Sequence, residues 1–528
     1  MHKNNAQKHL VNALIMMALL LGCNPTKTKE FSFNTFHSAV DSIVNGISEP
    51  EIPKFEIDLI EYSGKQPDRK GSYDFREVIQ RAINELSAKG GGRLIFSHTK
   101  DPQAWDKSIL TYRVSGPIEL RSNIALCFEP SVRLFFECNP PLYTNQNQGV
   151  ITRYEGTTCY GYSPCIRAFN VSNVALIALF GYGAMPIIDG DGEKWRQWEM
   201  DGSIRLEREG KPLAYSCIRD LNNADVPVAE RKPMQYKDWL LRPDLIQFFL
   251  SKNFKVEGLK ISNSPFWCIH PVFSSNGIIR NLVYDAPVTN NDGIDPESSK
   301  NILIENIMFN NHDDNVAIKA GRDKEGRDGA LVAGTPLEAI ASEYISDGRI
   351  KGSTENIVIR NCIFKGHHAV AIGSEMSGSV KNIYISDCYS VQDVFNGIYI
   401  KSSRKRGGTV SNIYVNNVRF TKVLETVVCL IPNYDGDTIS AFPPTFKDIF
   451  INNISAVSSQ DGIRIHGWSD APIKNIYIAN VTIDTVFSEK IHFKQVWNLQ
   501  LSSVHIGKTD YNLTTSDTSS HSKPPQSN

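Results

Sequence analysis

Short apolar runs that each open on Asn or Asp repeat along the second half of the chain. The openers are Asn253, Asn276, Asn301, Asn356, Asn382, Asn412, Asp448, Asn475 and Asn498. Most steps between them span about 23 to 30 residues, and every unit holds several short strands separated by Gly, Asn, Asp and Ser turns. This period predicts an all-β fold, a right-handed parallel β-helix. We interpret the openers as a structural ladder at the turns.

Residues 73–95 show a different pattern, which predicts one short amphipathic helix at the N-terminal end of the β-helix. Its apolar positions have helical spacing and precede three glycines and a strand: Phe75, Val78, Ile79, Ala82, Ile83 and Leu86. The double step from Asn301 to Asn356 contains a charged, Gly-rich stretch, residues 322–353, which we expect to overhang one face as a long loop. A propeller is the alternative fold, but its blades of about 40 residues and its hairpin turns do not match the pattern.

The N-terminal residues resemble an export signal. Lys3 and Lys8 precede an apolar run over residues 10–21, which is too short to span a bilayer and resembles a signal peptide. The run ends in Leu-Leu-Gly-Cys23, which resembles a bacterial lipobox with Cys23 as the lipidated residue; a plain signal peptide is the alternative. The predicted organisation is a signal peptide over 1–22, a lipid-anchored tether over 23–53, the β-helix domain over 54–507 and a disordered tail over 508–528.

Composition narrows the classes of partner. A formal net charge of −1 over 528 residues gives no support for nucleic-acid binding, while a local basic groove for an acidic polymer remains open. The cysteines form no CxxC pair, so no metal knuckle is expected. Cys159 and Cys165 are a disulfide or two free thiols, and Cys362, Cys388 and Cys429 are expected to be small buried residues.

Polar clusters at 289–295, 312–321, 366–375 and 397–408 interrupt the repeats. Asp292 and Asp314 are about one coil apart, so they should stack at about 4.8 Å, with Asp313 beside them. Neighbouring carboxylates raise at least one pKa, which leaves a proton available near neutral pH. Inverting glycoside hydrolysis needs one protonated and one ionised carboxyl group. Taken singly, an Asp-Gly or an Asp-Asp is also compatible with an ordinary turn or a solvated surface.

These clusters resemble the four signatures of the polygalacturonase family, glycoside hydrolase family 28, over most of residues 55–505. They stand here as Asn290-Asn291-Asp292, His312-Asp313-Asp314, Gly366-His367-His368 and Tyr399-Ile400-Lys401. The resemblance implies a right-handed parallel β-helix with a groove on its side. It also implies that Asp313 is the general acid, that Asp292 and Asp314 activate water, and that His367 supports the acid.

The departures from the family pattern concern substrate binding. Tyr399 stands where the family has an arginine, and His368 replaces the second glycine of Gly-His-Gly. We expect Lys401, Tyr399, Asn290, His368 and Arg406 to bind substrate, with Arg404 or Arg406 replacing the missing arginine. His368 is alternatively a packed histidine. Asp295 and Glu297 are assigned to the turn and its flanks.

The sequence therefore predicts a glycosidase that cleaves α-galacturonosyl linkages in pectic oligo- or polysaccharides with inversion, exo-acting, without metal or organic cofactor. The long loop and the Trp-Arg-Gln-Trp run at 195–198 are expected to close one end of the groove. A monomer on a bacterial cell envelope is expected, held by its lipid alone and facing the periplasm. The alternatives are a rhamnogalacturonan or branched-pectin hydrolase, a calcium-dependent lyase on the same fold, and a noncatalytic glycan-binding β-helix.

Overall fold

A computed structural model describes residues 33–99, 108–232 and 240–517. The chain divides into a short unit ending at Ala39 and a large unit from Val40 onward, and helix α2 (Phe33–Asn45) crosses the boundary between them. All strands belong to the large unit, whose fold is given below. Within the described ranges, no helix is both long and apolar enough to cross a bilayer.

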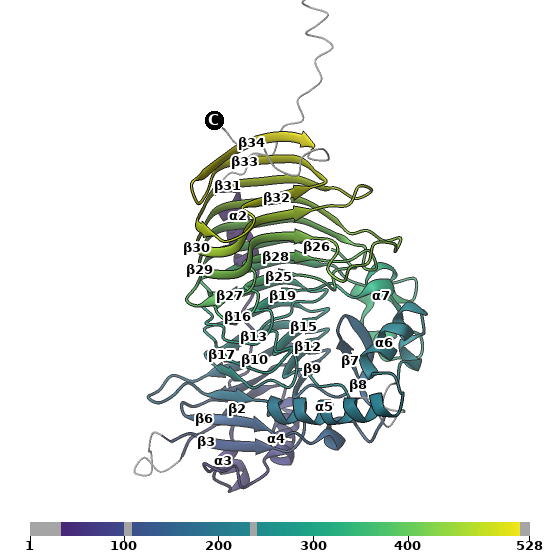
Figure 1. The fold of residues 1–528 in the computed structure, drawn as a ribbon. Helices are drawn as coiled ribbons and strands as arrows, with labels where there is room; N and C mark the ends of the chain where they lie inside the picture. The colour runs from purple at the N-terminus through teal and green to yellow at the C-terminus, as the bar shows by residue number, and fades with distance from the viewer. Residues whose placement is uncertain (1–32, 100–107, 233–239, 518–528) are drawn as a thin grey trace, which may run out of the picture. The chain divides into compact units, whose positions relative to one another are not determined.

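One long parallel ladder forms the spine of the large unit, and its strands lie one above another in Figure 1. Each strand pairs with the strand one coil later, as the repeat predicts. The strands in order are β1 (Glu56–Asp58), β2 (Gly92–Phe96), β5 (Ile124–Phe128), β10 (Ser172–Ala178), β13 (Lys252–Glu257), β16 (Ser275–Arg280), β18 (Lys300–Glu305), β23 (Thr354–Arg360), β26 (Val380–Ser390), β29 (Thr409–Ile431), β30 (Thr445–His466), β31 (Ile473–Val486) and β33 (Val496–Ile506).

Two further parallel columns complete each coil. The first, here called the acid face, contains β4 (Ile118–Glu119), β9 (Ile166–Phe169), β12 (Ile246–Phe249), β15 (Ile269–Val272), β19 (Val316–Ile318), β25 (Val370–Ile372), β28 (Ile398–Lys401) and β32 (Ile491–Lys494). The second contains β3 (Leu110–Val114), β6 (Val132–Phe136), β11 (Ile187–Asp189), β14 (Lys260–Ser262), β17 (Val283–Asp285) and β24 (Ile363–Phe364). The short strand β27 (Asp393–Val394) pairs with β29. Inward Ile, Val, Leu and Phe side chains of all three columns form one continuous core. The predicted right-handed parallel β-helix is confirmed.

The asparagine openers form the ladder that the sequence predicts. Asn382 donates from its amide to the side chain of Asn356 at 3.1 Å and accepts from Asn412 at 3.0 Å. Its φ is +57°, a left-handed conformation that asparagine tolerates better than other side chains. The ladder also extends backward beyond the predicted openers, to Asn173 and Asn123.

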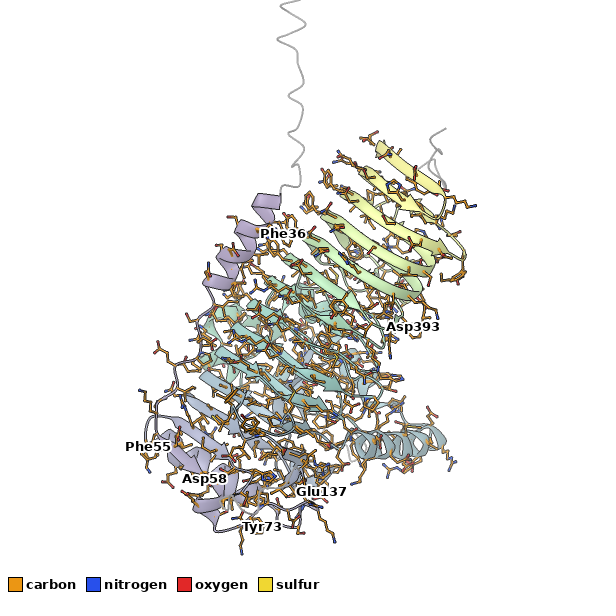
Figure 2. All side chains as sticks on the ribbon, turned by 90° about the vertical axis from the view of Figure 1, so that its left-hand side faces the viewer. Phe36, Phe55, Asp58, Tyr73, Glu137 and Asp393 are labelled. Atoms are coloured by element: carbon orange, nitrogen blue, oxygen red, sulfur yellow. The ribbon has the colours of Figure 1, made fainter. Side chains whose placement is uncertain are left out.

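The two ends of the β-helix are closed differently. Helix α4 (Arg76–Ala88) buries the apolar residues predicted for it, while the short helix α3 (Leu59–Ser63) begins after the capping carboxylate of Asp58. Figure 2 shows Asp58 and Tyr73 in the first coils, and Asp393 farther along the stack. At the other end β34 (Thr509–Asp517) pairs antiparallel with β33, so the prediction of a disordered tail is wrong for residues 509–517.

Insertions carry helices that the sequence analysis did not predict. These are α5 (Gly192–Arg208), α6 (Ala214–Asn223), α7 (Asp323–Asp328) and α8 (Leu337–Ile340), with 3-10 turns η1 (Pro140–Tyr143), η2 (Val228–Glu230) and η4 (Ser342–Tyr344). An antiparallel hairpin, β7 (Val150–Tyr154) and β8 (Thr157–Gly161), lies beside them in Figure 1. The expected long loop over 322–353 contains α7, α8 and a small sheet of β20 (Ala330–Leu331), β21 (Ile345–Ser346) and β22 (Arg349–Ile350).

Three other expectations concern particular residues. Cys159 and Cys165 are buried free thiols, so the disulfide alternative is wrong, and burial raises the pKa of Cys159 to about 12. Cys362, Cys388 and Cys429 are buried as predicted. Cys23, the signal peptide and the first part of the tether lie outside the described residues, whereas α2 occupies residues 33–45 of the expected tether.

Candidate active site

A groove of about 600 Å³ lies on the acid face, and three aspartates are among its lining residues. One carboxylate oxygen from each of Asp292, Asp313 and Asp314 lies within 4.8 Å of the other two. Asp313 is the most accessible, with 24% of its side chain exposed, against 5% for Asp292 and 2% for Asp314. The stacking of Asp292 and Asp314 expected from their one-coil separation is therefore present, with Asp313 facing the solvent.

Buried amides and glycines hold the turns that present these acids. Asn311 donates from its side-chain amide to the backbone carbonyls of Asn291, Asp313 and Asp314, each at 2.9 Å. The backbone N–H of Gly293 donates to the carbonyl of Asp314 at 2.9 Å. A Cβ at Gly293 would lie 2.4 Å from a carbonyl oxygen of the next coil, so the Asp-Gly pair is required by close packing of successive turns.

Two buried ammonium groups neutralise the acids. The Nζ of Lys401 lies 3.0 Å from Asp314, and the Nζ of Lys319 lies 3.3 Å from Asp292. Lys319 also approaches Asp295 at 3.4 Å and lies over the Trp267 ring at 4.4 Å. The predicted contact between Lys401 and substrate therefore competes with an ion pair to a neighbouring acid.

The environment separates the acids electrostatically. Burial and the neighbouring Asp313 carboxylate raise the pKa of Asp292 to about 7, while burial and Asp314 raise the pKa of Asp313. Burial alone would also raise the pKa of Asp314, but the Lys401 ammonium holds it below its usual range. The cluster therefore holds a proton near neutral pH and keeps Asp314 ionised.

The two histidines lie on the next coil and have different surroundings. His367 Nδ1 lies 3.7 Å from Asp313, and although burial acts in the opposite direction, the carboxylates of Asp314 and Asp313 raise its pKa. His368 accepts a hydrogen bond from Asn396 at 3.2 Å, and burial lowers its pKa to about 3. The ring of Tyr399 packs on His368 with centroids 4.8 Å apart. Tyr399 and His368, both predicted to bind substrate, thus pack against each other as buried residues, and neither is among the residues that line the groove.

Asn290, Lys401 and Arg406, which the sequence predicts to bind substrate, are among the residues that line the groove. Asn290 accepts a hydrogen bond from Arg242 at 2.7 Å. Arg406 forms an ion pair with Asp323 and lies 3.6 Å from Glu375. The alternative compensating residue, Arg404, pairs instead with Asp470 at 2.8 Å and does not line the groove.

One side of the groove is built by four charged residues of the insertions and the acid face: Glu155, Arg219, Arg322 and Glu375. Arg322 pairs with Glu155 at 3.1 Å and with Glu375 at 2.6 Å, while Arg219 pairs with Glu155 at 2.5 Å. Trp195 of the 195–198 run is fully buried, and no residue of this run is among those that line the groove, contrary to the expectation that it closes one end.

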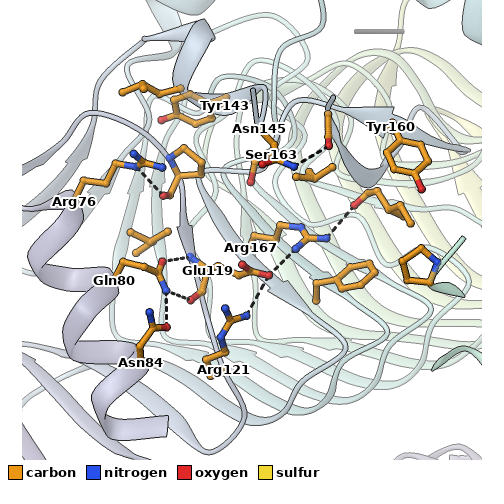
Figure 3. Close-up of a pocket in the computed structure, with 18 residues that line it drawn as sticks. Arg76, Gln80, Asn84, Glu119, Arg121, Tyr143, Asn145, Tyr160, Ser163 and Arg167 are labelled. Atoms are coloured by element: carbon orange, nitrogen blue, oxygen red, sulfur yellow. Dashed lines mark hydrogen bonds and ion pairs between the residues drawn. The ribbon is translucent and has the colours of Figure 1, made fainter. Parts of the chain in front are cut away.

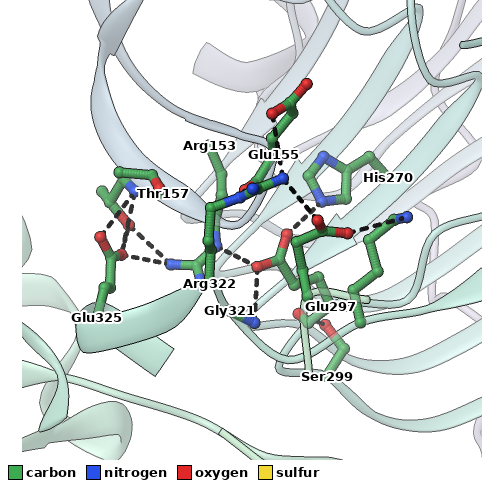
Figure 4. A network of polar contacts seen from close by, with 12 residues as sticks. Arg153, Glu155, Thr157, His270, Glu297, Ser299, Gly321, Arg322 and Glu325 are labelled. Carbon is green, nitrogen blue, oxygen red and sulfur yellow. Dashed lines mark hydrogen bonds and ion pairs between the residues drawn. The ribbon is translucent and has the colours of Figure 1, made fainter. Parts of the chain in front are cut away.

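The β7–β8 hairpin is fixed across the acid face by a buried polar network (Figure 4). Arg153 of the hairpin pairs with Glu297 at 2.5 Å and with Glu325 at 2.6 Å. Glu297 also lies 3.1 Å from His270, whose other ring nitrogen is 2.8 Å from Asp244. Because these groups are almost fully buried, removing one partner would leave a charge uncompensated, so the hairpin is firmly held.

Sequence reasoning did not single out Lys319, Glu375 or Arg322, and it placed Asp295 in a turn. Strand alternation could have found Lys319, because it follows the inward Val316 and Ile318 of β19 as Lys401 follows the inward Ile398 and Ile400 of β28. Glu375 and Arg322 depend on how the insertions return to the groove, which no local pattern encodes. Asp295 is fully buried, and burial and Asp292 raise its pKa well above the usual range.

Comparison with known proteins assigns the fold and site to a family. The family model of glycosyl hydrolases family 28 matches residues 229–503, just over half of the chain. The chain belongs to glycosyl hydrolases family 28. It is accordingly a glycosidase, as predicted. The matched region contains all four signatures and the three clustered aspartates, Asp292, Asp313 and Asp314.

Two relatives match more of the chain than the family model does, and a third matches somewhat less. An exopolygalacturonase from Thermotoga maritima has 30% identity and a TM-score of 0.76, covering 91% of this chain and 98% of its own. An endo-polygalacturonase from Pectobacterium carotovorum is 28% identical over 78% of this chain and 84% of its own length. A probable polygalacturonase from Vitis vinifera is 31% identical, and that match spans 46% of each protein.

Proposed function

We propose that the protein hydrolyses α-galacturonosyl linkages in pectic oligosaccharides, acting from a chain end. The proposal rests on the cluster of Asp292, Asp313 and Asp314 in an open groove. Burial raises the pKa of Asp292, while the Lys401 ammonium lowers the pKa of Asp314. Family 28 relatives named as polygalacturonases support the substrate class. A charged sugar also suits a groove lined by Arg219, Arg322 and several lysines.

Each acid has a role that its position supports. Asp313 is the acid most open to the groove and has a raised pKa, so it protonates the leaving glycosidic oxygen. A water between Asp292 and Asp314 can lie within about 2.7 Å of both carboxylates, since their oxygens are within 4.8 Å. That water attacks the anomeric carbon, the glycosidic bond breaks, and the water's proton passes to the Asp292–Asp314 pair. His367 positions Asp313.

We propose that hydrolysis inverts the anomeric carbon, and the spacing of the three carboxylates bears on this proposal. Inverting glycosidases usually separate their carboxyl groups by about 6.5–9.5 Å, whereas retaining ones use about 5–5.5 Å. The acids here are nearer than either range, but two of them together can hold one water. NMR of the first product should show the β-anomer from an α-linked substrate. If the α-anomer formed first, direct attack by water would be contradicted, and a covalent glycosyl-enzyme intermediate would be indicated.

The position of the β7–β8 hairpin supports exo action. It lies over Gln247 and His270 of the acid face, which are 1% and 0% exposed, so the groove ends on that side. In the other direction, the side chains of Arg464 and His492 on later coils are 37% and 32% exposed. A chain can therefore extend from the acids toward the later coils and not past the hairpin.

Product analysis tests the function directly. The protein is incubated with homogalacturonan and rhamnogalacturonan oligosaccharides, beside Asp313→Asn. Release of single galacturonate units by the parent and not by the variant is expected. Mixed oligomers would contradict exo action, and activity confined to rhamnose-containing substrates would favour the branched-pectin alternative. No product from any pectic substrate, with sugar binding retained in both proteins, would favour a noncatalytic glycan-binding β-helix.

A calcium-dependent lyase is the rival on the same fold, because three carboxylates are suitable cation ligands. The ammonium groups of Lys319 and Lys401 already neutralise Asp292 and Asp314, which disfavours a cation there. Activity should therefore survive a chelator, without an unsaturated product absorbing in the near ultraviolet. Loss of activity on chelation, restored by calcium, would favour the lyase.

We further propose that Cys23 anchors the enzyme to a bacterial envelope, facing the periplasm. The Leu-Leu-Gly-Cys sequence after an apolar run supports this. In a bacterial host, metabolic labelling with a fatty acid should mark the full chain and not Cys23→Ala. Equal labelling of both would contradict the anchor, and protease accessibility in intact cells would distinguish the periplasm from the cell surface.

A further inference from the structure

The acid face continues beyond the hairpin toward the N-terminal end. Arg167 of β9 is in register with Glu119 of β4 on one side and with Gln247 of β12 on the other. Gln247 is buried beneath the hairpin, where Thr152 donates to it at 3.1 Å. Glu119 and Arg167 are less covered, with 38% and 11% of their side chains exposed. The hairpin thus divides one sheet face into two accessible parts.

A cavity of about 500 Å³ occupies the N-terminal part (Figure 3). Its lining comes from α4, from β4 and β9, and from the hairpin. Helix α4 contributes Arg76, Gln80 and Asn84, while Tyr160 of the hairpin and Phe169 of β9 provide aromatic surface. The volume is in the range of about 300–1,000 Å³ typical of small-molecule sites.

The charge of this cavity differs from that of the active site. Three arginines, Arg76, Arg121 and Arg167, face one carboxylate, Glu119, among its lining residues. Glu119 pairs with Arg167 at 2.7 Å and with Arg121 at 3.3 Å. The lining therefore has an excess of positive charge. It also contains the side-chain amides of Gln80 and Asn84.

Two of the arginines retain donors for a ligand. Arg121 makes its ion pair through Nη1 alone, and a guanidinium has five N–H donors. Arg76 donates from Nε to the Pro117 carbonyl at 3.3 Å and from Nη1 to Glu77, whose side chain is 85% exposed. A planar carboxylate between them could replace the weak surface pair with charged hydrogen bonds.

We propose that this cavity is a second, noncatalytic binding site for a uronate-containing oligosaccharide. Arg121 and Arg76 bind the uronate carboxylate, the Asn84 amide N–H groups bind a hydroxyl group, and Tyr160 offers an apolar face to a sugar ring. Gln80 donates to the Asn84 side chain at 3.3 Å and to the Glu119 carbonyl at 3.0 Å, so it orients Asn84. The inference rests on the proposed function for the identity of the polymer. Because the hairpin separates this site from Asp313, a chain bound here is held and not cut.

Calorimetry with trigalacturonate tests the second site in the full-length Asp313→Asn variant, which keeps the sugar intact. Two binding events per chain are expected. Arg121→Ala in that background should weaken one of them about tenfold or more, and Arg121→Glu should abolish it. Arg93→Ala is the matched control, because its side chain is 42% exposed and also pairs with a glutamate, against 43% for Arg121. It should leave both events unchanged.

The outcomes separate this inference from the proposed function. A single binding event that Arg121→Glu leaves unchanged would overturn the second site, whether or not the parent enzyme hydrolyses pectic substrates. Equal binding of a neutral galactose trisaccharide at the second site would also overturn its assignment to uronates. The proposed function fails only if the parent releases no product, which the binding titration does not measure. Melting temperatures of all variants show that each is folded.

Discussion

The asparagine ladder and the acid face arise from the same repeating coils, yet they differ in what they repeat. Along the ladder nearly every coil places an asparagine in the same left-handed turn and bonds it to the next one. Along the acid face successive coils place Asp292, then Asp313 and Asp314, then His367 and His368, then Lys401. One side of the coil therefore maintains the fold, which leaves the other side free to vary its chemistry.

This difference predicts that substitutions on the two sides separate activity from stability. The largest effect is expected at Asp313. Asp313→Asn removes the proposed proton donor, so kcat should fall by about 10²- to 10⁴-fold, while the melting temperature stays close to that of the parent. The control is Asp393→Asn, which removes an exposed carboxylate paired with Lys422 and should change neither quantity. Retained activity in Asp313→Asn would remove the proposed acid.

Lys401→Met tests a residue that should affect both properties. The ammonium holds the pKa of Asp314 below its usual range, so its loss raises that pKa. The acid limb of the kcat/KM profile should therefore move to higher pH. A carboxyl group whose pKa is lowered by folding stabilises the fold at pH values above its pKa in the unfolded chain. The variant should therefore also lose about 3–5 kcal/mol of unfolding free energy at neutral pH. Stopped assays across pH and urea unfolding measure the two effects; an unmoved acid limb would contradict the role of Lys401.

A ladder substitution should change stability alone. Asn382→Ala removes two side-chain hydrogen bonds and places alanine at a φ of +57°, so it should lose about 2–3 kcal/mol of unfolding free energy. Asn382→Gly removes the same bonds without the backbone cost and should lose about 1 kcal/mol less. Activity below the melting temperature should equal that of the parent. Equal losses in the two variants would show that the left-handed turn contributes nothing.

The smallest effect is expected at Asp295, behind the acid cluster. Burial and Asp292 raise its pKa, so its folded form binds a proton more tightly than its unfolded form. The free energy of unfolding therefore falls as the pH rises from the ordinary carboxyl pKa toward the raised pKa of Asp295. Asp295→Asn should therefore gain about 1 kcal/mol at pH 8 and nothing at pH 4. Melting temperatures at both pH values test this, and an equal change at both would contradict it.

The sequence reveals the ladder better than it reveals the groove. Openers such as Asn356 recur at a fixed period, so the fold and the stacking of Asp292 with Asp314 could be predicted. Residues brought in by insertions could not. Arg322 and Glu155 are 167 positions apart and meet through a hairpin and a helix that share no repeat. The packing of Tyr399 could not be predicted either, because alternation shows that its side chain points outward without showing that the His368 ring packs against it.

The last strand, β34, determines which backbone edge lies at the end of the β-helix. A parallel stack ends in a row of unpaired backbone groups, which is a template for the next coil of a second copy. Strand β34 reverses direction, occupies that row and presents a sequence rich in Thr, Asp and Asn. The coil end therefore offers a polar antiparallel strand, and not the parallel partner that a second copy would need to continue the register.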